Sequence, residues 1–140
     1  MCVRDVEGAF VLARTKWFSP ITDVDIEEAI RLLKAMERVR DLHLWNMDFE
    51  LDSKTIVDNI SGKQTGVSDF GATITHCVHL LCTDLMNSHV KFIRRQAIEV
   101  AHSLAKAALS EASFRVYSHI PTCIESIIII PTCFSKKKCF

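Results

Sequence analysis

Acidic and basic side chains, the groups that bind metal cations and phosphates, are unevenly distributed along this sequence. Residues 1–60 contain eight Lys/Arg and twelve Asp/Glu, whereas residues 61–140 contain nine Lys/Arg and five Asp/Glu. Carboxylate oxygens are the preferred ligands of hard divalent cations, and Lys and Arg neutralise the phosphates of nucleic acids. The distribution is therefore compatible with a metal-dependent nuclease. The simpler interpretation is two solvated surfaces of opposite charge.

His79 and Cys82 are a second group with ligand chemistry, because a spacing of three residues places them on one face of a helix. The same segment carries an apolar stripe, formed by Ile74, Val78, Leu81 and Leu85. No second ligand pair follows at the spacing of a zinc site, and the six cysteines include no CxxC pair. We therefore expect a helix that packs on a core, with its cysteines reduced.

Length and composition restrict the class of protein. The chain has 140 residues, enough for one domain, and its 49% hydrophobic and 24% charged residues are typical of a globular fold. The longest aliphatic run, residues 127–130, is far shorter than the ~20 residues of a membrane helix. Arg4, Asp5 and Glu7 lie where a signal peptide would be apolar. We therefore expect an intracellular protein, cytoplasmic or nuclear, with no membrane partner.

The hydrophobic pattern predicts the elements that position these side chains. Residues 1–4 and 9–18 flank an acidic, glycine-containing turn and are typical of a β-hairpin. Apolar residues then recur at helical spacing from residue 22 or 23 to about residue 40. Residues 42–51 alternate apolar and polar side chains, which predicts a strand with Trp45 in the core rather than stacked on a nucleobase.

The second half of the sequence continues the alternation of helices and strands. A short helix is predicted at residues 53–62, a longer one at about residues 69–86 and a last one at about residues 97–110. Residues 90–94 have the composition of a short strand. We therefore expect an α/β fold with a mixed sheet flanked by helices. The strands at 42–51 and 90–94 should be parallel neighbours, since helices connect them.

The periodic pattern weakens near the C-terminus. Residues 120–124 and 130–134 share the sequence Ile-Pro-Thr-Cys followed by an apolar residue, but two copies are too few for a repeat architecture. We assign residues 1–112 to one domain and expect residues 113–140 to form an irregular tail.

Three segments occur in an order and at a spacing that are specific in combination. They are EEAIRLLKAM at residues 27–36, FELDSKTIV at residues 49–57 and FIRRQAIEVAHSLA at residues 92–105. With the hairpin before them, they resemble the RNase H-like domain of plant non-LTR retroelement reverse transcriptases, a branch of the type 1 ribonuclease H family. The resemblance covers about residues 1–109.

This resemblance implies an RNase H-like fold and hydrolysis of the RNA strand of an RNA–DNA hybrid with Mg²⁺ as cofactor. A pair of such ions about 4 Å apart activates the attacking water and stabilises the leaving oxygen. The resemblance implies that Glu28 and Asp52 are catalytic metal ligands, and it places His102 at the catalytic position of the last helix. The basic residues expected to contact the nucleic acid are Lys63, Lys91, Arg94 and Arg95.

The sequence departs from the family pattern in two places. The family's central first strand, with its leading Asp, has no counterpart, and the hairpin could instead close up against the 42–51 strand. Ile98 replaces a polar Asn of the last motif. Because Glu28 and Asp52 are then the only aligned carboxylates and His102 is a poor ligand for a hard cation, Mg²⁺ should bind weakly and cleavage should be slow or absent.

Three functions are compatible with these observations. The first is a hybrid endoribonuclease weakened or inactive in this copy, and the second is a nucleic-acid-binding protein without catalysis. The third is a protein-interaction module. Apart from the resemblance, Glu28 would be an ordinary solvated helix residue and Asp52 a cap of the following helix.

Overall fold

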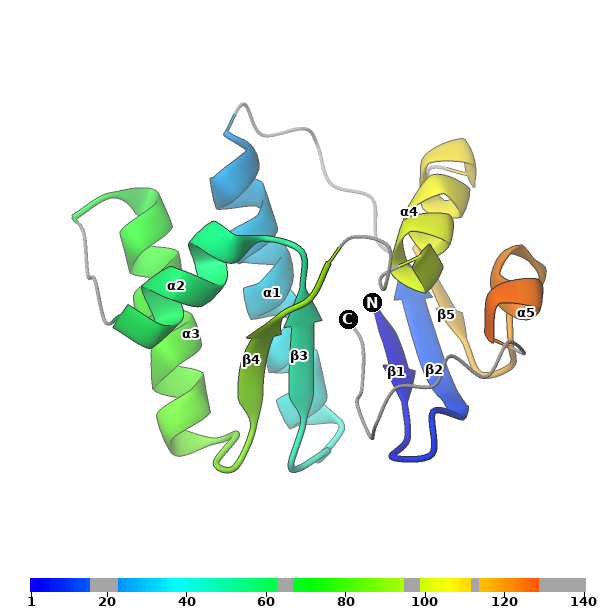
Figure 1. Cartoon of the computed structure of the whole chain (residues 1–140), viewed down its shortest axis with the longest axis horizontal. Coiled ribbons are helices and arrows are strands. Elements are labelled where there is room, and N and C mark those ends of the chain that lie inside the picture. Colours follow the sequence, from blue (N-terminus) through cyan, green and yellow to red (C-terminus); the bar gives the residue numbers. More distant parts are fainter. Residues whose placement is uncertain (16–22, 63–66, 95–98, 112–113, 129–140) are drawn as a thin grey trace. The chain divides into compact units, whose positions relative to one another are not determined.

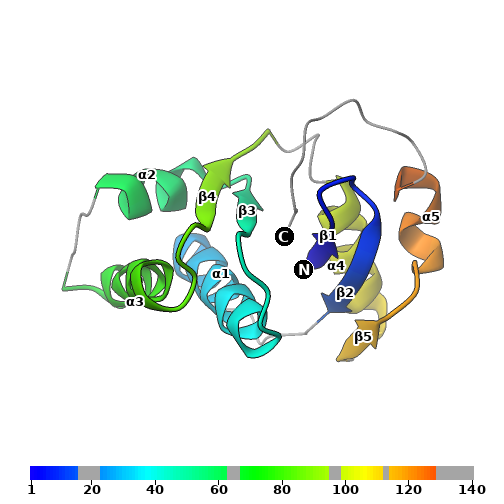
Figure 2. The ribbon, with the colours of Figure 1, turned by 90° about the horizontal axis from the view of Figure 1, so that it is seen from below.

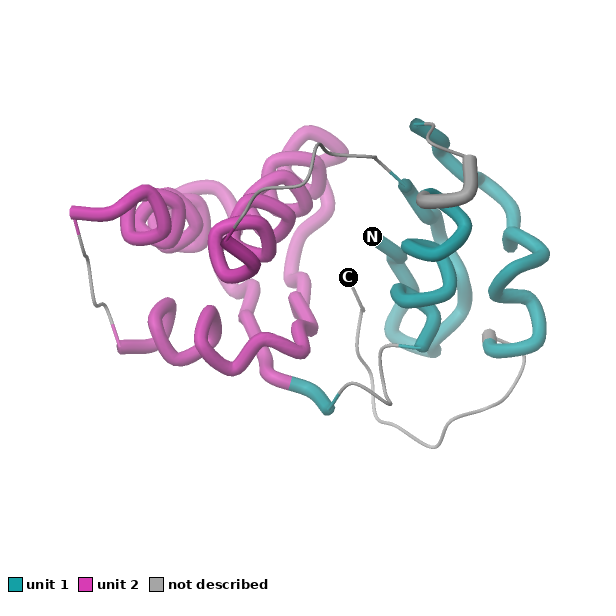
Figure 3. The backbone as a smooth tube through the Cα atoms, turned by 90° about the horizontal axis from the view of Figure 1, so that it is seen from above, with its two compact units in different colours: residues 1–19, 93–140 teal, residues 20–92 magenta. Residues whose placement is uncertain are grey.

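The computed structural model describes five stretches of the chain, residues 1–15, 23–62, 67–94, 99–111 and 114–128 (Figure 1). Along the sequence the elements follow the order β1, β2, α1, β3, α2, α3, β4, α4, β5 and α5. The chain divides into two compact units, drawn in different colours in Figure 3. Unit 1 comprises residues 1–19 and 93–140, and unit 2 comprises residues 20–92.

Unit 2 is built on two parallel strands, β3 (Asp48–Leu51) and β4 (His89–Phe92). They pair in register, with Phe49 opposite Val90. The predicted parallel pairing is therefore confirmed. The strands are separated along the chain by α2 (Lys54–Gly62) and α3 (Asp69–Thr83), close to the predicted helices.

Helix α1 (Val24–Asp41) confirms the predicted first helix, and its sequence explains where it begins. The Asp23 carboxylate caps the helix by accepting hydrogen bonds from the backbone N–H groups of Asp25 and Ile26, at 2.9 and 3.2 Å. Helices α1 and α3 pack against each other (Figure 2). Their buried side chains are Ala29, Leu32, Leu33, Met36 and Val39 from α1, and Ile74, Cys77 and Leu80 from α3.

The end of α1 explains why the strand predicted at residues 42–51 is shorter in the structure. His43 N–H donates to the Arg40 carbonyl and Leu44 N–H to the Val39 carbonyl, the hydrogen bonds of a Schellman motif. His43 adopts the left-handed φ of 52° that this motif requires. The segment before Asp48 is therefore a helix-terminating turn, and the expectation of Trp45 in the core is wrong, since 55% of this residue is exposed.

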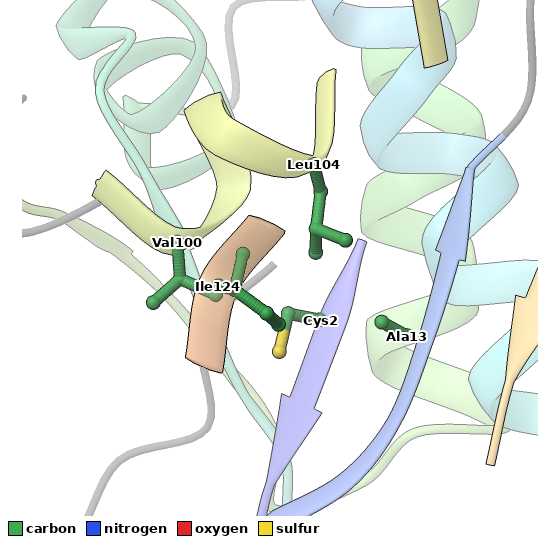
Figure 4. Close-up of a cluster of buried hydrophobic side chains, with 5 residues drawn as sticks. All are labelled: Cys2, Ala13, Val100, Leu104 and Ile124. Carbon is green, nitrogen blue, oxygen red and sulfur yellow. The ribbon is translucent and has the colours of Figure 1, made fainter. Parts of the chain in front are cut away.

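Unit 1 contains a three-stranded antiparallel sheet in the order β1 (Cys2–Arg4), β2 (Phe10–Thr15) and β5 (Arg115–Tyr117). Two helices, α4 (Glu99–Glu111) and α5 (Thr122–Ile128), complete the unit. Side chains from β1, β2, α4 and α5 point toward one another in a small core (Figure 4). Its members are Cys2, Ala13, Val100, Leu104 and Ile124.

The turn between β1 and β2 confirms the predicted hairpin. The Asp5 carboxylate accepts hydrogen bonds from the N–H groups of Glu7 and Ala9, at 2.9 and 2.8 Å. Gly8 has a φ of 85°, a conformation that L side chains rarely adopt. Asp5 therefore stabilises the turn by accepting backbone hydrogen bonds, and Gly8 provides the positive φ that the turn requires.

The described strands form two separate sheets, β1-β2-β5 and β3-β4. Strand β2 pairs with β5, which lies in the segment expected to be irregular, and α5 follows it. Elements of three and seven residues are too short for hydrophobic periodicity to reveal them. Among the described residues, no helix combines the length and apolar character needed to cross a bilayer.

Candidate metal ligands and nucleic-acid interface

Glu28, the first candidate metal ligand, lies in α1 beside the buried face of the helix. It precedes the fully buried Ala29 and stands four residues before Leu32, and it is itself half-buried. Its neighbour Glu27 forms an ion pair with Arg31 on the exposed side of the helix. The Glu28 carboxylate is therefore at the border between the packed and the solvated faces of α1.

Asp52, the second candidate ligand, directly follows β3 and is half-buried. The residue that caps α2 is Ser53, whose Oγ accepts a hydrogen bond from the Ile56 N–H at 3.5 Å. Asp52 lies at the carboxyl end of a parallel strand, a place where ligands commonly bind in α/β sheets. Glu28 and Asp52 both belong to unit 2.

His102, the third candidate, lies in α4 and therefore in unit 1, where it is half-buried. The part of the chain that the structure describes contains no group of three or more His, Cys, Asp or Glu side chains that could hold a metal ion. Each ion of a two-metal site needs several oxygen ligands at short range. Glu28 and Asp52, which would hold such an ion, are not part of a ligand group of this size among the described residues.

Lys91 was expected to contact phosphate, and in the structure it forms an ion pair that the sequence did not indicate. Its Nζ donates to Oδ2 of Asp48 at 2.6 Å, and Nδ1 of His89 lies 3.6 Å from Oδ1 of the same carboxylate. The pairing of β3 with β4 brings these residues together. Asp48 could have been predicted as the partner of Lys91 only if the register between β3 and β4 had been known from the sequence.

The other expected phosphate contacts have different surroundings. Arg94 is exposed, two residues beyond the end of β4, and it forms no ion pair with any residue that the structure describes. Lys63 and Arg95 lie outside the described residues. Of the two expected phosphate contacts that the structure describes, Arg94 therefore has the less compensated charge.

The charge asymmetry of the sequence follows the division into units. Unit 2 contains twelve acidic and seven basic residues, a formal charge of −5, and unit 1 contains five acidic and ten basic residues, a formal charge of +5. A polyanion is attracted to the basic unit and repelled by the acidic one. Phosphate binding is therefore favoured on unit 1.

Together these features define a class of protein, a mixed α/β domain consistent with an RNase H-like fold. The model of the reverse transcriptase-like family matches residues 1–108, so the chain belongs to this family. Proteins of this RNase H-like type bind nucleic acids and normally use divalent metal ions. No curated protein and no solved structure matches the chain significantly.

Proposed function

We propose that this chain is a nucleic-acid-binding RNase H-like domain of plant non-LTR retroelement type, which binds RNA–DNA hybrids and cleaves them weakly or not at all. The observation that carries the proposal is the family match over residues 1–108, which includes all three motif segments. Family membership supports nucleic-acid binding, and the choice of a hybrid as substrate rests on the motifs. The RNase H-like domain is proposed to comprise residues 1–112, and β5 and α5 add to it as further parts of unit 1.

The basic residues around the end of β4 support the proposed binding of phosphate. Arg94 is exposed and has no ion pair among the described residues, whereas Asp48 already balances much of the charge of Lys91. Because binding to phosphates releases counterions, affinity should fall steeply with salt. Arg94 should therefore contribute more to binding than Lys91, with Lys63 and Arg95 as further contacts.

Binding is tested by fluorescence anisotropy of a labelled RNA–DNA hybrid at several salt concentrations. Arg94→Gln should weaken binding a few-fold and lower the salt slope by about one. Arg31→Gln is the matched control, because Arg31 lies on acidic unit 2 and already pairs with Glu27. Equal losses in both variants, or affinity independent of salt, would contradict the proposed interface.

The proposed weakness of cleavage follows from the number of ligands. Glu28 and Asp52 are the carboxylates assigned to Mg²⁺, and His102 offers a nitrogen, which a hard cation binds poorly. The second candidate function is nucleic-acid binding without catalysis.

A cleavage assay tests the ligand count and the assignment of Glu28 and Asp52. The purified chain is incubated with a labelled hybrid and Mg²⁺, beside Asp52→Asn and a version extended by an N-terminal strand that carries an Asp. The unextended chain should give little product, and Asp52→Asn should not change that result. Robust cleavage that Asp52→Asn abolishes would show that the ligand count is wrong. An extended version that fails to cleave would weaken the assignment of Glu28 and Asp52.

A further inference from the structure

A cavity of about 750 Å³ lies in unit 2, at the opposite end of the β3–β4 sheet from Asp52. It is formed by the end of α1, the turn before β3 and the turn before β4, and the proposed function does not use it. Its volume is in the range of small-ligand sites, about 300–1,000 Å³. Its lining includes Arg40, Asp41, His43, Trp45, Asp84 and Met86.

The aromatic side of the cavity is Trp45, of which 55% is exposed. Its ring centroid is 6.3 Å from that of His43, and the two planes are inclined by 34°. Met86, also in the lining, is 63% exposed. A large aromatic face that is open to solvent attracts cations through its negative electrostatic potential.

The polar side of the cavity has more negative than positive charge. Arg40 donates from Nε and Nη2 to Oδ1 of Asp41 at 3.2 and 3.1 Å, and its Nη1 lies 3.7 Å from Oδ2 of Asp84. One guanidinium is therefore shared by two carboxylates, which leaves a formal charge of −1. The recorded contacts use one oxygen of each carboxylate, and 52% of the Asp41 and 41% of the Asp84 side chain is exposed.

The backbone around the cavity is unusual. His43, Asn46 and Asn87 have φ values of 52°, 56° and 66°, and they are the non-glycine residues with positive φ in the described part of the chain. All three line this cavity. His43 adopts this conformation because it terminates α1, and asparagine adopts it more readily than most other residues with a Cβ. The turn that follows α1 leaves the Trp45 side chain exposed.

We propose that this cavity binds the guanidinium group of an arginine side chain in a basic peptide. The planar cation stacks on Trp45, and its N–H groups donate to the carboxylates of Asp84 and Asp41. Guanidinium is the cation that fits best, because it combines a flat face for stacking with a fork of donors for carboxylates. The formal charge of −5 on unit 2 attracts a basic peptide and repels a nucleic acid.

The proposal is tested with two matched peptides, acetyl-Gly-Arg-Gly-amide and its citrulline counterpart, which has nearly the same shape and no charge. Calorimetry on the full chain measures affinity, and Trp45 emission in a Trp17→Phe background reports the site. We expect saturable binding of the arginine peptide with a change in Trp45 emission, and binding at least tenfold weaker for citrulline. Equal affinity for the two peptides would overturn the proposal.

Two variants distinguish binding of the peptide in this cavity from its general attraction to the negative charge of unit 2. Asp84→Asn should weaken binding of the arginine peptide about tenfold, since a hydrogen bond to a charged group is lost. Asp58→Asn is the control, because Asp58 is an exposed carboxylate on α2 that pairs with Lys54 outside the cavity. Equal losses in both variants, or a single-stranded RNA oligonucleotide that changes Trp45 emission where the peptide does not, would overturn the proposal. Circular dichroism shows that each variant is folded.

Discussion

Two cysteines of α3 show how burial changes the chemistry of one residue type. Cys77 is fully buried, and loss of solvation raises the pKa of its thiol to about 12, with a smaller contribution from the charge of Glu37. Cys82, one turn further along, is exposed. The helical stripe in the sequence predicted a buried face here, but the extent of burial at each cysteine depends on packing against α1.

Stability should therefore decrease at alkaline pH. Because the unfolded thiol ionises near its ordinary pKa of 9.0 and the folded one near 12, the free energy of unfolding should fall between these values, by up to about 1.4 kcal/mol per pH unit. Urea unfolding at about pH 8 and pH 10 measures the change. Cys77→Ala should reduce the pH dependence and Cys82→Ala should leave it unchanged. Identical pH dependence in all three proteins would contradict the assignment.

The candidate site was predictable only in part from single residues. The motif match supplied Glu28, Asp52 and His102, whereas their surroundings depend on the packed structure. The ion pair between Asp48 and Lys91 illustrates the limit. These residues directly precede two different motifs, and they meet because β3 and β4 pair in a particular register, which no local pattern contains.

At the scale of elements, helices were easier to predict than strands. The start of α1 follows from its Asp23 cap and its apolar stripe, both of which are local in the sequence. The start of β3 was misplaced because His43 terminates α1 in a left-handed conformation, where sequence rules expect glycine. Strand β5 was not predicted because its three residues show no strand pattern by themselves. They form a strand because they pair with β2.

The strained position at His43 predicts a stabilising substitution. His43→Gly should raise the free energy of unfolding by about 0.5–1 kcal/mol, because relief of the left-handed conformation exceeds the extra entropy of the unfolded chain. Thermal and urea unfolding measure the effect. His43→Ala is the control and should give no gain, since it removes the ring and retains the Cβ. A His43→Gly variant less stable than His43→Ala would contradict the Schellman assignment.

At the scale of the whole molecule, the sequence indicated a charge asymmetry but not its boundaries. In the sequence the charge changes sign between residues 1–60 and 61–140. In the structure the opposite charges belong to the two units, with −5 on unit 2 and +5 on unit 1. The chain as a whole has no formal net charge. Self-repulsion between copies is therefore weak, while oppositely charged surfaces on different copies attract each other.

We therefore expect reversible self-association at low ionic strength and neutral pH. Light scattering coupled to gel filtration should show an apparent mass above that of the monomer at about 20 mM salt, where screening extends over more than 20 Å. The mass should fall toward the monomer at about 300 mM salt, where screening is short. An apparent mass that rises with salt would indicate that apolar contacts dominate instead.

The pairing of β2 with β5 has a consequence for how the protein is made. Unit 1 combines the first residues of the chain with its last third, whereas unit 2 is continuous. On a ribosome, unit 2 can fold as soon as β4 has emerged, but the N-terminal hairpin must wait for β5, whose Arg115 pairs with Thr15 and is synthesised about 100 residues later. During that interval the hairpin's apolar side chains lack α4 and α5, which complete their core. The slow step of folding is therefore expected to be the closure of this long-range pairing.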